Sequence, residues 1–453
     1  MTILARAAAC GYPLELVAHL ENRDPALADL GLLLVTELAE VTVAAGDHEH
    51  GAVRKSHANF AIRTLGDHAL DCSLRRLLAN RTALTVYHGE RRAEPRRAPR
   101  GLDVYYIEDH RAYAYDPTIE SGTMDPSRNL KVLGGVLERY GFGDRWAFLD
   151  SAKEQYVGMS RERCIELFRD ADMVVNLCGA TEPREEHERT RCLVYLETDP
   201  GIMQLELARK IPTAVAFAKS HRLFFTYCCN IGAPDCLLPT AGLDWHPTRP
   251  PVNLDEWHPG VGPAAPRAFT TVGTWQNNGS DMVIKGETYY WSKHLNFRKV
   301  LEVAARANQP IEIATNLTAG ADYDRALAGG FSITPAVPMS LDIDTYRDYI
   351  SRSRGEFTAT KDIYVRPRTG WFSDRTVCYL AAGRPVVTQR TGFEKFIPTG
   401  AGLLGFDTAD DAVDAIGEIN AGYPRHAQAA REIAVEYFDA VKLLDEVAVA
   451  AGI

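Results

Sequence analysis

Residues 355–387 read GEFTATKDIYVRPRTGWFSDRTVCYLAAGRPVV, and the order of residue types in this stretch predicts a strand, a turn and a capped helix. Residues 355–358 have the composition of a short buried strand, and Ser373 and Asp374 are favoured N-cap residues for a helix over 375–382. Gly383 stands where glycine commonly ends a helix. The first amides of such a helix have no partner within it, so the stretch predicts an anion site. The alternative is a capped helix between two strands that binds nothing.

The same stretch resembles the donor-binding motif of GT-B glycosyltransferases, in which a Gly-Trp-x-Ser turn opens a helix that ends in Gly-x-Pro-Val. The matching segments are 370–373 (GWFS) and 383–386 (GRPV). Residues 291–294 (WSKH) are similar to a segment of bacterial GT-B-like proteins. The resemblance covers about residues 101–445, and it is strongest to bacterial, nucleotide-sugar-dependent enzymes of the family 1/4-like type.

This resemblance implies an α/β fold of the GT-B kind, with two Rossmann-like domains whose parallel sheets face each other across a cleft. It implies a metal-independent hexosyltransferase that moves a sugar from a nucleotide-diphosphate donor, with a UDP-sugar such as UDP-glucose favoured, to a hydroxyl of a small molecule. A bacterial natural product and a nucleoside are candidate acceptors. The nucleotide sugar is a co-substrate, and no further cofactor is expected.

Two features depart from the pattern of the family. Arg368 and Thr369 stand where a His-Cys pair is usual before the Gly-Trp. Cys378 stands where an acidic residue commonly holds the donor ribose. We therefore expect Asp374 or Glu356 to take over ribose recognition.

Composition excludes several classes of protein. The 453 residues carry a formal net charge of −10, which repels nucleic-acid phosphates. The nine cysteines form no Cys-x-x-Cys pair, so a structural zinc site is not expected. No apolar run approaches the roughly 20 residues of a membrane helix, and no signal peptide is recognisable. We expect a cytoplasmic enzyme without membrane or nucleic-acid partners, and a homodimer remains open.

Strand-like and helix-like segments alternate on both sides of a proline-rich stretch at 234–267, which we interpret as an interdomain linker. We expect an N-terminal acceptor-binding domain over 1–258 and a C-terminal nucleotide-sugar-binding domain over 259–430. A terminal helix over 431–453 should cross back to the first domain, as the resemblance implies. The expected segments that matter below are a strand at 213–218, one helix over 291–307 and one helix over 427–449.

The donor site is expected at the carboxyl ends of the C-terminal strands. Gly370 should let the backbone approach the ligand, and four nearby cations, Arg375, Arg368, Arg366 and Lys361, could offset the charge of a diphosphate. Trp275 is either a base-stacking ring or a core aromatic. The predicted donor-binding residues are Gly273, Trp275, Lys293, Thr315, Asn316, Glu356, Arg368, Gly370, Trp371, Phe372, Ser373, Asp374, Arg375, Thr391 and Gly392.

An inverting transfer needs a general base beside the acceptor hydroxyl. Asp109 and Asp199 follow two N-terminal strands and are candidates, with His48 in reserve. The alternative is that these carboxylates cap the next helices. The predicted acceptor-binding residues are Glu108, Glu197 and Asn230.

Three other activities are weighed against a transferase. A nicotinamide-dependent oxidoreductase would need a G-x-G-x-x-G string, which the chain lacks. A nucleotide-sugar epimerase of GT-B fold would use the same diphosphate site. A non-catalytic nucleotide-sugar-binding protein would not need acidic residues at strand ends.

Overall fold

The computed structural model divides the chain into two compact units, 1–60 and 61–453. The structure describes residues 102–453 except 110–113, 117–120, 261–266 and 277–278. All features below belong to the second unit. The predictions for the first hundred residues, including His48, lie outside the described residues.

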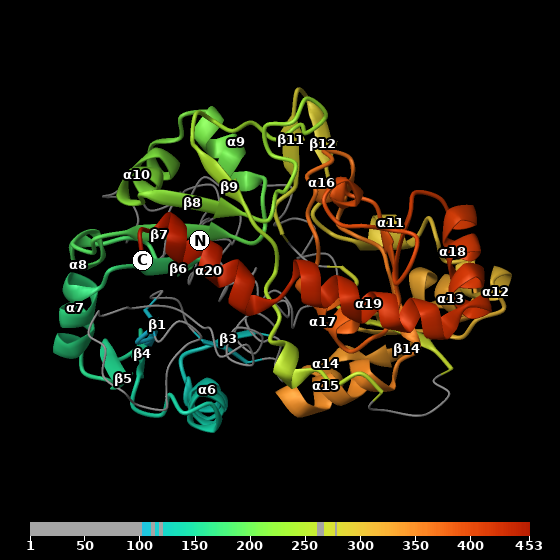
Figure 1. Cartoon of the computed structure of the whole chain (residues 1–453), viewed down its shortest axis with the longest axis horizontal. Coiled ribbons are helices and arrows are strands. Elements are labelled where there is room, and N and C mark those ends of the chain that lie inside the picture. The colour runs from blue at the N-terminus through green and yellow to red at the C-terminus, as the bar shows by residue number, and fades with distance from the viewer. Residues whose placement is uncertain (1–101, 110–113, 117–120, 261–266, 277–278) are drawn as a thin grey trace, which may run out of the picture. The chain divides into compact units, whose positions relative to one another are not determined.

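The C-terminal half of the described chain is built on a six-stranded, fully parallel sheet (Figure 1). The strand order is β14-β13-β10-β15-β16-β17. The chain therefore winds outward from β10 to one edge and then from β15 to the other edge. The strands are β10 (Phe269–Val272), β13 (Ile311–Thr315), β14 (Phe331–Pro335), β15 (Gly355–Thr358), β16 (Val386–Gln389) and β17 (Leu403–Phe406).

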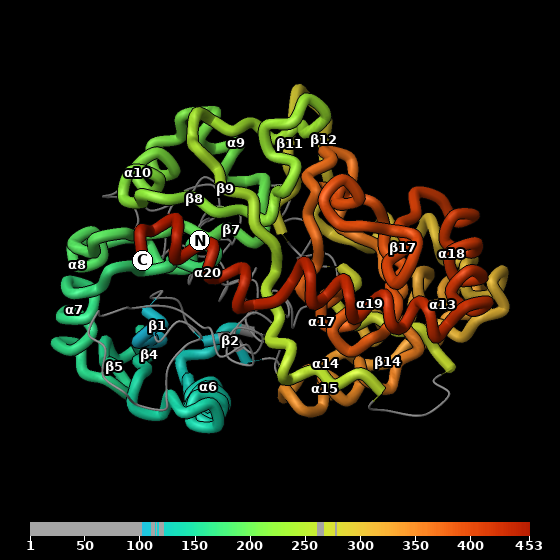
Figure 2. Tube along the Cα trace, viewed as in Figure 1, coloured from blue at the N-terminus to red at the C-terminus, as the bar shows by residue number. Residues whose placement is uncertain are grey.

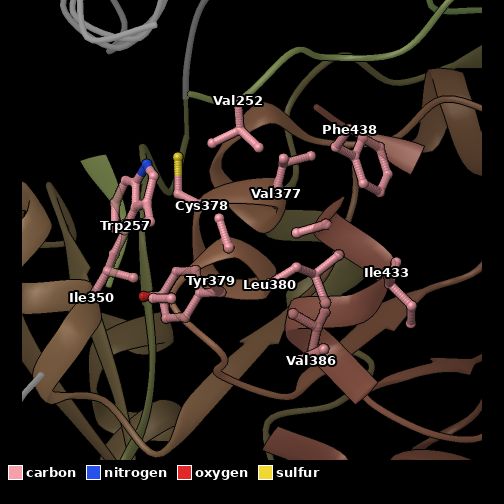
Figure 3. Close-up of a cluster of buried hydrophobic side chains, with 14 of the residues drawn as sticks. Val252, Trp257, Ile350, Val377, Cys378, Tyr379, Leu380, Val386, Ile433 and Phe438 are labelled. Carbon is pink, nitrogen blue, oxygen red and sulfur yellow. The ribbon is translucent and has the colours of Figure 1, made fainter. Parts of the chain in front are cut away.

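Helices cover both faces of this sheet, because consecutive strand residues point to opposite sides. Val386 belongs to a core cluster with Tyr379 and Phe438 (Figure 3), whereas Val387 belongs to a second cluster with Phe357. The helices of this half are α11 (His294–Phe297), α12 (Val303–Arg306), α13 (Ala321–Ala328), α14 (Ala336–Ser340), α15 (Ile343–Arg352), α16 (Asp362–Val365), α17 (Asp374–Ala381), α18 (Ala409–Ala421) and α19 (Tyr423–Tyr437). A hairpin of β11 (Met282–Ile284) and β12 (Glu287–Tyr289) and the short η3 (Phe393–Lys395) complete it.

A four-stranded parallel sheet forms the N-terminal half, in the order β6-β7-β8-β9. Its strands are β6 (Val174–Leu177), β7 (Leu193–Glu197), β8 (Leu223–Thr226) and β9 (Trp245–Pro247). Its helices are α7 (Arg161–Asp170), α8 (Glu185–Glu188), α9 (Ile202–Ala208) and α10 (Pro212–Ser220). The predicted α/β class with two parallel sheets is thus confirmed.

Smaller elements precede this sheet along the chain. In a three-stranded sheet, β4 (Trp146–Asp150) pairs in parallel with β1 (Tyr106–Glu108) and antiparallel with β5 (Gln155–Gly158). β2 (Ala114–Asp116) and β3 (Ser121–Thr123) form a hairpin, and α6 (Ser127–Arg139) follows it.

Three of the predicted elements are wrong. The strand expected at 213–218 is the helix α10, because Pro212 sits in its first turn, where a missing N–H costs nothing. The single helix expected over 291–307 is the two short helices α11 and α12, joined by turns whose bonds span three residues, such as Val300 N to Phe297 O (2.9 Å). The linker at 234–267 includes β9 and the short η2 (Leu254–Glu256), so part of it belongs to the first sheet.

The expected helix over 427–449 is also divided, into α19 and α20 (Ala440–Ala450). Val252 donates its N–H to Phe438 O at 2.8 Å and accepts the N–H of Ala440 at 3.1 Å. These bonds accompany the break at residues 438 and 439, and the Asp439 side chain then caps α20 through Val441 N at 3.0 Å.

After this break the chain returns to the first sheet. Val447 of α20 is buried in one cluster with Leu196 and Phe225, which belong to β7 and β8. α20 runs beside that sheet, whereas α19 lies along the C-terminal half (Figure 2).

Candidate functional site

The order of strands in the C-terminal sheet reverses between β10 and β15. Ligands of doubly wound sheets bind beside the carboxyl ends of the strands at such a point. Gly273 directly follows β10, and its N–H bonds Ala314 O at 2.9 Å. A Cβ on Gly273 would lie 3.0 Å from Lys293 Nζ and 3.4 Å from Arg375 Nη1. Two cationic groups therefore lie against a residue without a side chain at this point.

The Arg375 side chain forms hydrogen bonds to the ends of the two central strands, β10 and β15. Its Nη1 donates to Val272 O and its Nη2 to Thr358 Oγ1, both at 2.9 Å, and its Nε bonds Glu356 Oε1 at 2.5 Å. Glu356 is fully buried. Glu356 thus forms a buried ion pair with Arg375, and its predicted contact with a ribose stays a prediction.

The helix α17 begins at the same point. Its own hydrogen bonds start at Val377 N, which donates to Ser373 O at 3.1 Å, so the amides of residues 374–376 have no partner inside the helix. Ser373 is the N-cap by backbone geometry, but its side chain makes no capping bond. The predicted helix start is therefore present, with Ser373 as its N-cap residue.

Buried hydroxyl groups support the same position. Thr315 ends β13, next to β10, and Thr376 lies in the first turn of α17. Both side-chain oxygens are buried and have no hydrogen-bond partner among the described residues, and the same holds for Glu356 Oε2. A buried polar atom without a protein partner is commonly satisfied by water or a ligand. The sequence pointed to Thr315 as a strand end but gave no signal for Thr376.

Gly370 lies in close contact with another segment of the protein. Its φ is +75°, and an added Cβ would lie 2.8 Å from Asn230 N. Its N–H bonds Thr391 O at 2.8 Å, and Asn230 N donates to Thr369 O at 3.0 Å. A close approach that requires glycine is therefore made to the protein segment that contains Asn230, and the predicted contact with a ligand stays a prediction.

The two aromatic residues after Gly370 serve the same attachment. Trp371 stacks on Tyr364 with ring centroids 4.3 Å apart, and its Nε1 donates to Thr198 O at 2.8 Å. Phe372 is buried against Phe393 and Phe438. Trp371 and Phe372 thus pack inside the protein, and their contacts with a ligand stay predictions.

The loop after β16 supports this turn. Thr391 Oγ1 donates to Trp371 O at 2.6 Å, and Gly392 N bonds Glu394 Oε2 at 3.2 Å. This loop was predicted to touch the sugar. In the structure these groups hold the turn at 369–371.

The four cations expected to offset a diphosphate each have a carboxylate partner. Arg368 pairs with Asp235 (3.0 Å) and Glu394 (3.2 Å). Lys361 pairs with Asp199, Arg366 with Asp362, and Arg375 with Glu356. Lys293 is the fifth cation of the predicted set, and its Nζ would lie 3.0 Å from a Cβ on Gly273.

Trp275 is the core aromatic of the two predicted alternatives. It is buried and stacks on Phe297 with centroids 5.3 Å apart, and its Nε1 donates to Asp322 Oδ2 at 2.9 Å. Asn316 Oδ1 accepts the N–H of Trp275 at 2.8 Å. Asn316 therefore shapes the loop after β10.

Both side-chain oxygens of Asp109 are hydrogen-bonded within the protein. Oδ1 accepts from Thr181 Oγ1 at 3.0 Å, and Oδ2 bonds His187 Nε2 at 3.0 Å and Arg184 Nη2 at 2.5 Å. Burial alone would raise the pKa of Asp109, but His187 and Arg184 hold it well below its usual range. The group lines a cavity of about 40 Å³ with Asn176 and Phe168, which has room for water. Three side chains thus engage the Asp109 carboxylate, and its role as a base stays a prediction.

Asp199 has a different environment. Its Oδ1 accepts from Lys361 Nζ at 3.1 Å and from Tyr364 Oη at 2.5 Å, and its side chain remains 21% exposed. Burial raises its pKa, but Lys361 and Tyr364 outweigh that effect and lower it. Lys361 also lies over the Trp291 ring, 3.4 Å from the centroid. Asp199 thus connects β7 to the C-terminal half, a contact that no sequence pattern indicated.

The predicted acceptor-binding residues are not gathered at one point. Glu197 is buried and accepts Thr226 Oγ1 at 2.7 Å and Gln204 Nε2, and burial raises its pKa to about 8. Glu108 accepts the Tyr106 hydroxyl at 3.0 Å. Asn230 donates its amide to Arg368 O at 2.8 Å. Glu197 and Asn230 are thus engaged inside the protein.

In the described part of the chain, no helix is long and apolar enough to cross a membrane. Likewise, no three His, Cys, Asp or Glu side chains among the described residues are placed to hold a metal ion.

Neither the sequence profiles of known protein families nor the curated protein sequences match this chain. Among solved structures, the chain is similar to Alr3699/HepE from Anabaena in complex with UDP and glucose, with 13% identity and a TM-score of 0.44 over 77% of this chain and 99% of that one. It is similar to AviGT4, a glycosyltransferase involved in avilamycin A biosynthesis (13%, 0.40, 65% and 79%), and to a glycosyltransferase from Rickettsia africae (12%, 0.40, 71% and 91%). These values assign neither an activity nor a substrate to this chain.

Proposed function

We propose that this chain is a glycosyltransferase that moves a sugar from a nucleotide-diphosphate donor, with a UDP-sugar favoured, to a hydroxyl of a small-molecule acceptor. One observation carries the proposal. At the point where the order of the doubly wound sheet reverses, a bare glycine, a lysine and the start of a helix lie together. This combination suits a diphosphate at a strand end.

The proposed diphosphate lies beside Gly273, where the missing side chain leaves room. Lys293 Nζ supplies a charge, and the amides of residues 374–376 supply hydrogen bonds along the helix dipole. Arg375 joins the ends of β10 and β15 through its hydrogen bonds to Val272 O and Thr358 Oγ1. The unpaired hydroxyls of Thr315 and Thr376 are candidates for the remaining polar contacts.

The reaction would be a displacement at the anomeric carbon, in which the leaving diphosphate gains negative charge. Donors that are fixed beside that diphosphate stabilise the transition state more than the ground state. Asp199 is the candidate base that the described residues retain. Because Lys361 keeps it ionised, it can accept a proton, although its lowered pKa makes it a weak base. The expected domain boundaries at 258 and 430 remain part of this proposal.

The test is a calorimetric titration of the full chain with UDP, UDP-glucose and NAD. We expect UDP and UDP-glucose to bind and NAD not to bind. Lys293→Ala should weaken UDP binding by about tenfold or more, since a hydrogen bond to a charged group contributes about 1.5–3 kcal/mol. Lys285→Ala, in the exposed turn between β11 and β12, is the matched control and should bind UDP like the parent.

Product analysis then identifies the reaction. Formation of a glycosylated acceptor supports a transferase, whereas isomerised donor without a glycosylated product indicates an epimerase. Binding without turnover over a panel of hydroxyl acceptors indicates a binding protein. If neither UDP nor UDP-glucose binds the parent chain, or if Lys293→Ala binds UDP normally, the proposed site is wrong.

A further inference from the structure

The loop after β8 contains two thiols in contact. Cys228 and Cys236 have their sulfur atoms 3.9 Å apart, and both are free thiols. Cys228 is buried and Cys236 is partly exposed. The sequence separates them by eight positions, and only the fold of the loop brings them together.

This loop is also bonded to the turn at 367–370. Asn230 N donates to Thr369 O at 3.0 Å, and Leu237 N donates to Pro367 O at 3.0 Å. Asp235, next to Cys236, pairs with Arg368 at 3.0 Å and with Lys395 at 2.6 Å. A change in the separation of the two thiols would therefore reach the turn through bonds at both ends of the loop.

The two sulfur atoms differ in reactivity. The hydrogen bond from Cys228 lowers the pKa of Cys236 and outweighs the opposing effect of its burial, and Lys395 acts in the same direction. A thiol that is partly exposed and partly ionised is the one that peroxides attack first. Cys229, by contrast, is buried and donates to Thr248 O at 3.3 Å, and burial raises its pKa to about 11.

We propose that Cys228 and Cys236 are a redox-sensitive pair that a hydroperoxide converts to a disulfide, and that the disulfide shifts the turn at 367–370. The Cys236 thiolate attacks one peroxide oxygen, which breaks the O–O bond, gives a sulfenic acid and releases hydroxide. The Cys228 sulfur then attacks the sulfenic sulfur, and its proton and the departing hydroxide form water. Two thiols and one hydrogen peroxide thus give one disulfide and two waters.

The movement that this step requires is small but not negligible. A disulfide has its sulfur atoms about 2.05 Å apart, so the pair must close by roughly 1.9 Å from its present 3.9 Å. Cys228 lies two residues after the end of β8, and its N–H bonds Thr226 Oγ1 at 3.1 Å. The Cys236 end of the loop, which carries Asp235 and Leu237, is therefore expected to move.

The experiment treats the full-length protein with hydrogen peroxide and then blocks the remaining thiols. Trypsin releases residues 223–267 as one peptide, because Arg249 is followed by Pro250. We expect this peptide to lose two hydrogen atoms in the parent chain and in Cys229→Ser, and to lose none in Cys228→Ser or Cys236→Ser. Cys229→Ser is the matched control because it removes a neighbouring thiol in the same peptide.

Hydrogen exchange measures the structural consequence. Oxidation should speed exchange at the amides of Asn230 and Leu237 in the parent and in Cys229→Ser, and a reducing thiol should restore it. The pair is refuted if peroxide yields only sulfinic or sulfonic acid at Cys236, or if the link forms from Cys229. The coupling is refuted if the disulfide forms and exchange at these amides is unchanged. Neither outcome depends on the proposed transferase activity.

Discussion

Gly370 offers a direct test of what the Gly-Trp turn does in this protein. An alanine at φ +75° would carry the strain of a left-handed residue, about 1–2 kcal/mol. Its Cβ would also lie 2.8 Å from Asn230 N and 3.2 Å from Cys229 Cβ. Overpacking of this kind costs about 1–3 kcal/mol. We expect Gly370→Ala to lower the free energy of unfolding by about 2–5 kcal/mol.

Gly286→Ala separates the two contributions. Gly286 has a similar φ of +83°, in the turn between β11 and β12, but an added Cβ there meets no atom within 4 Å. This variant should lose only the strain, about 1–2 kcal/mol. The measurement is urea unfolding of both variants and the parent, with the slope compared to check that the same unit unfolds.

The two interpretations of Gly370 give opposite results. If the glycine is needed for contact with Asn230, Gly370→Ala is clearly less stable than Gly286→Ala. Equal stability of the two variants, together with weakened UDP binding in Gly370→Ala alone, would refute our reasoning. That result would instead support the prediction from the sequence that Gly370 lets the backbone approach a ligand.

Three further predictions concern the N-terminal carboxylates. Asp109→Asn should lower the free energy of unfolding, measured by urea unfolding, by about 3 kcal/mol, because Arg184 loses its buried partner. Since the pKa of Asp109 is lowered in the folded state, this difference should be present above about pH 4 and shrink on acidification. Glu197 has its pKa raised to about 8 by burial, so the parent should lose stability between about pH 4.3 and 8 relative to Glu197→Gln, as melting temperatures across that range would show; parallel curves would contradict it. Asp199→Asn should lower turnover by about 100-fold if Asp199 is the base. Tyr364→Phe removes only the hydroxyl group that donates to Asp199 and should not lower turnover to that extent. Equal losses in the two variants would indicate that the contact between Tyr364 and Asp199 is structural.

The class of the fold follows from local sequence patterns. Short segments with at most one charged residue, at 269–273, 310–314, 355–358 and 402–406, each contain most or all of a strand. Strands of a parallel sheet are buried on both faces and are therefore poor in charged residues. The helix α17 was predictable because Ser373 precedes it as the N-cap residue and Gly383 follows its C-terminal end. The sequence could not exclude the helix α10 at 212–220, where a short apolar run fits either structure.

The candidate site was predicted in position but not in detail. The sequence placed the helix start and Gly273 at strand ends, and both lie at the point where the strand order reverses. It also assigned Arg375, Arg368 and Lys361 to a diphosphate. The structure gives each of these cations a carboxylate partner, and none of those partners is a close neighbour in sequence.

What the sequence alone determined is therefore the type and order of the elements, since strand and helix patterns depend on neighbouring residues. Only the tertiary structure decided which charged groups are satisfied, that Gly370 approaches Asn230, and that Cys228 meets Cys236. The physical reason is range. Ion pairs and close contacts join residues that folding brings together from distant parts of the chain, and no local pattern records which partners will meet.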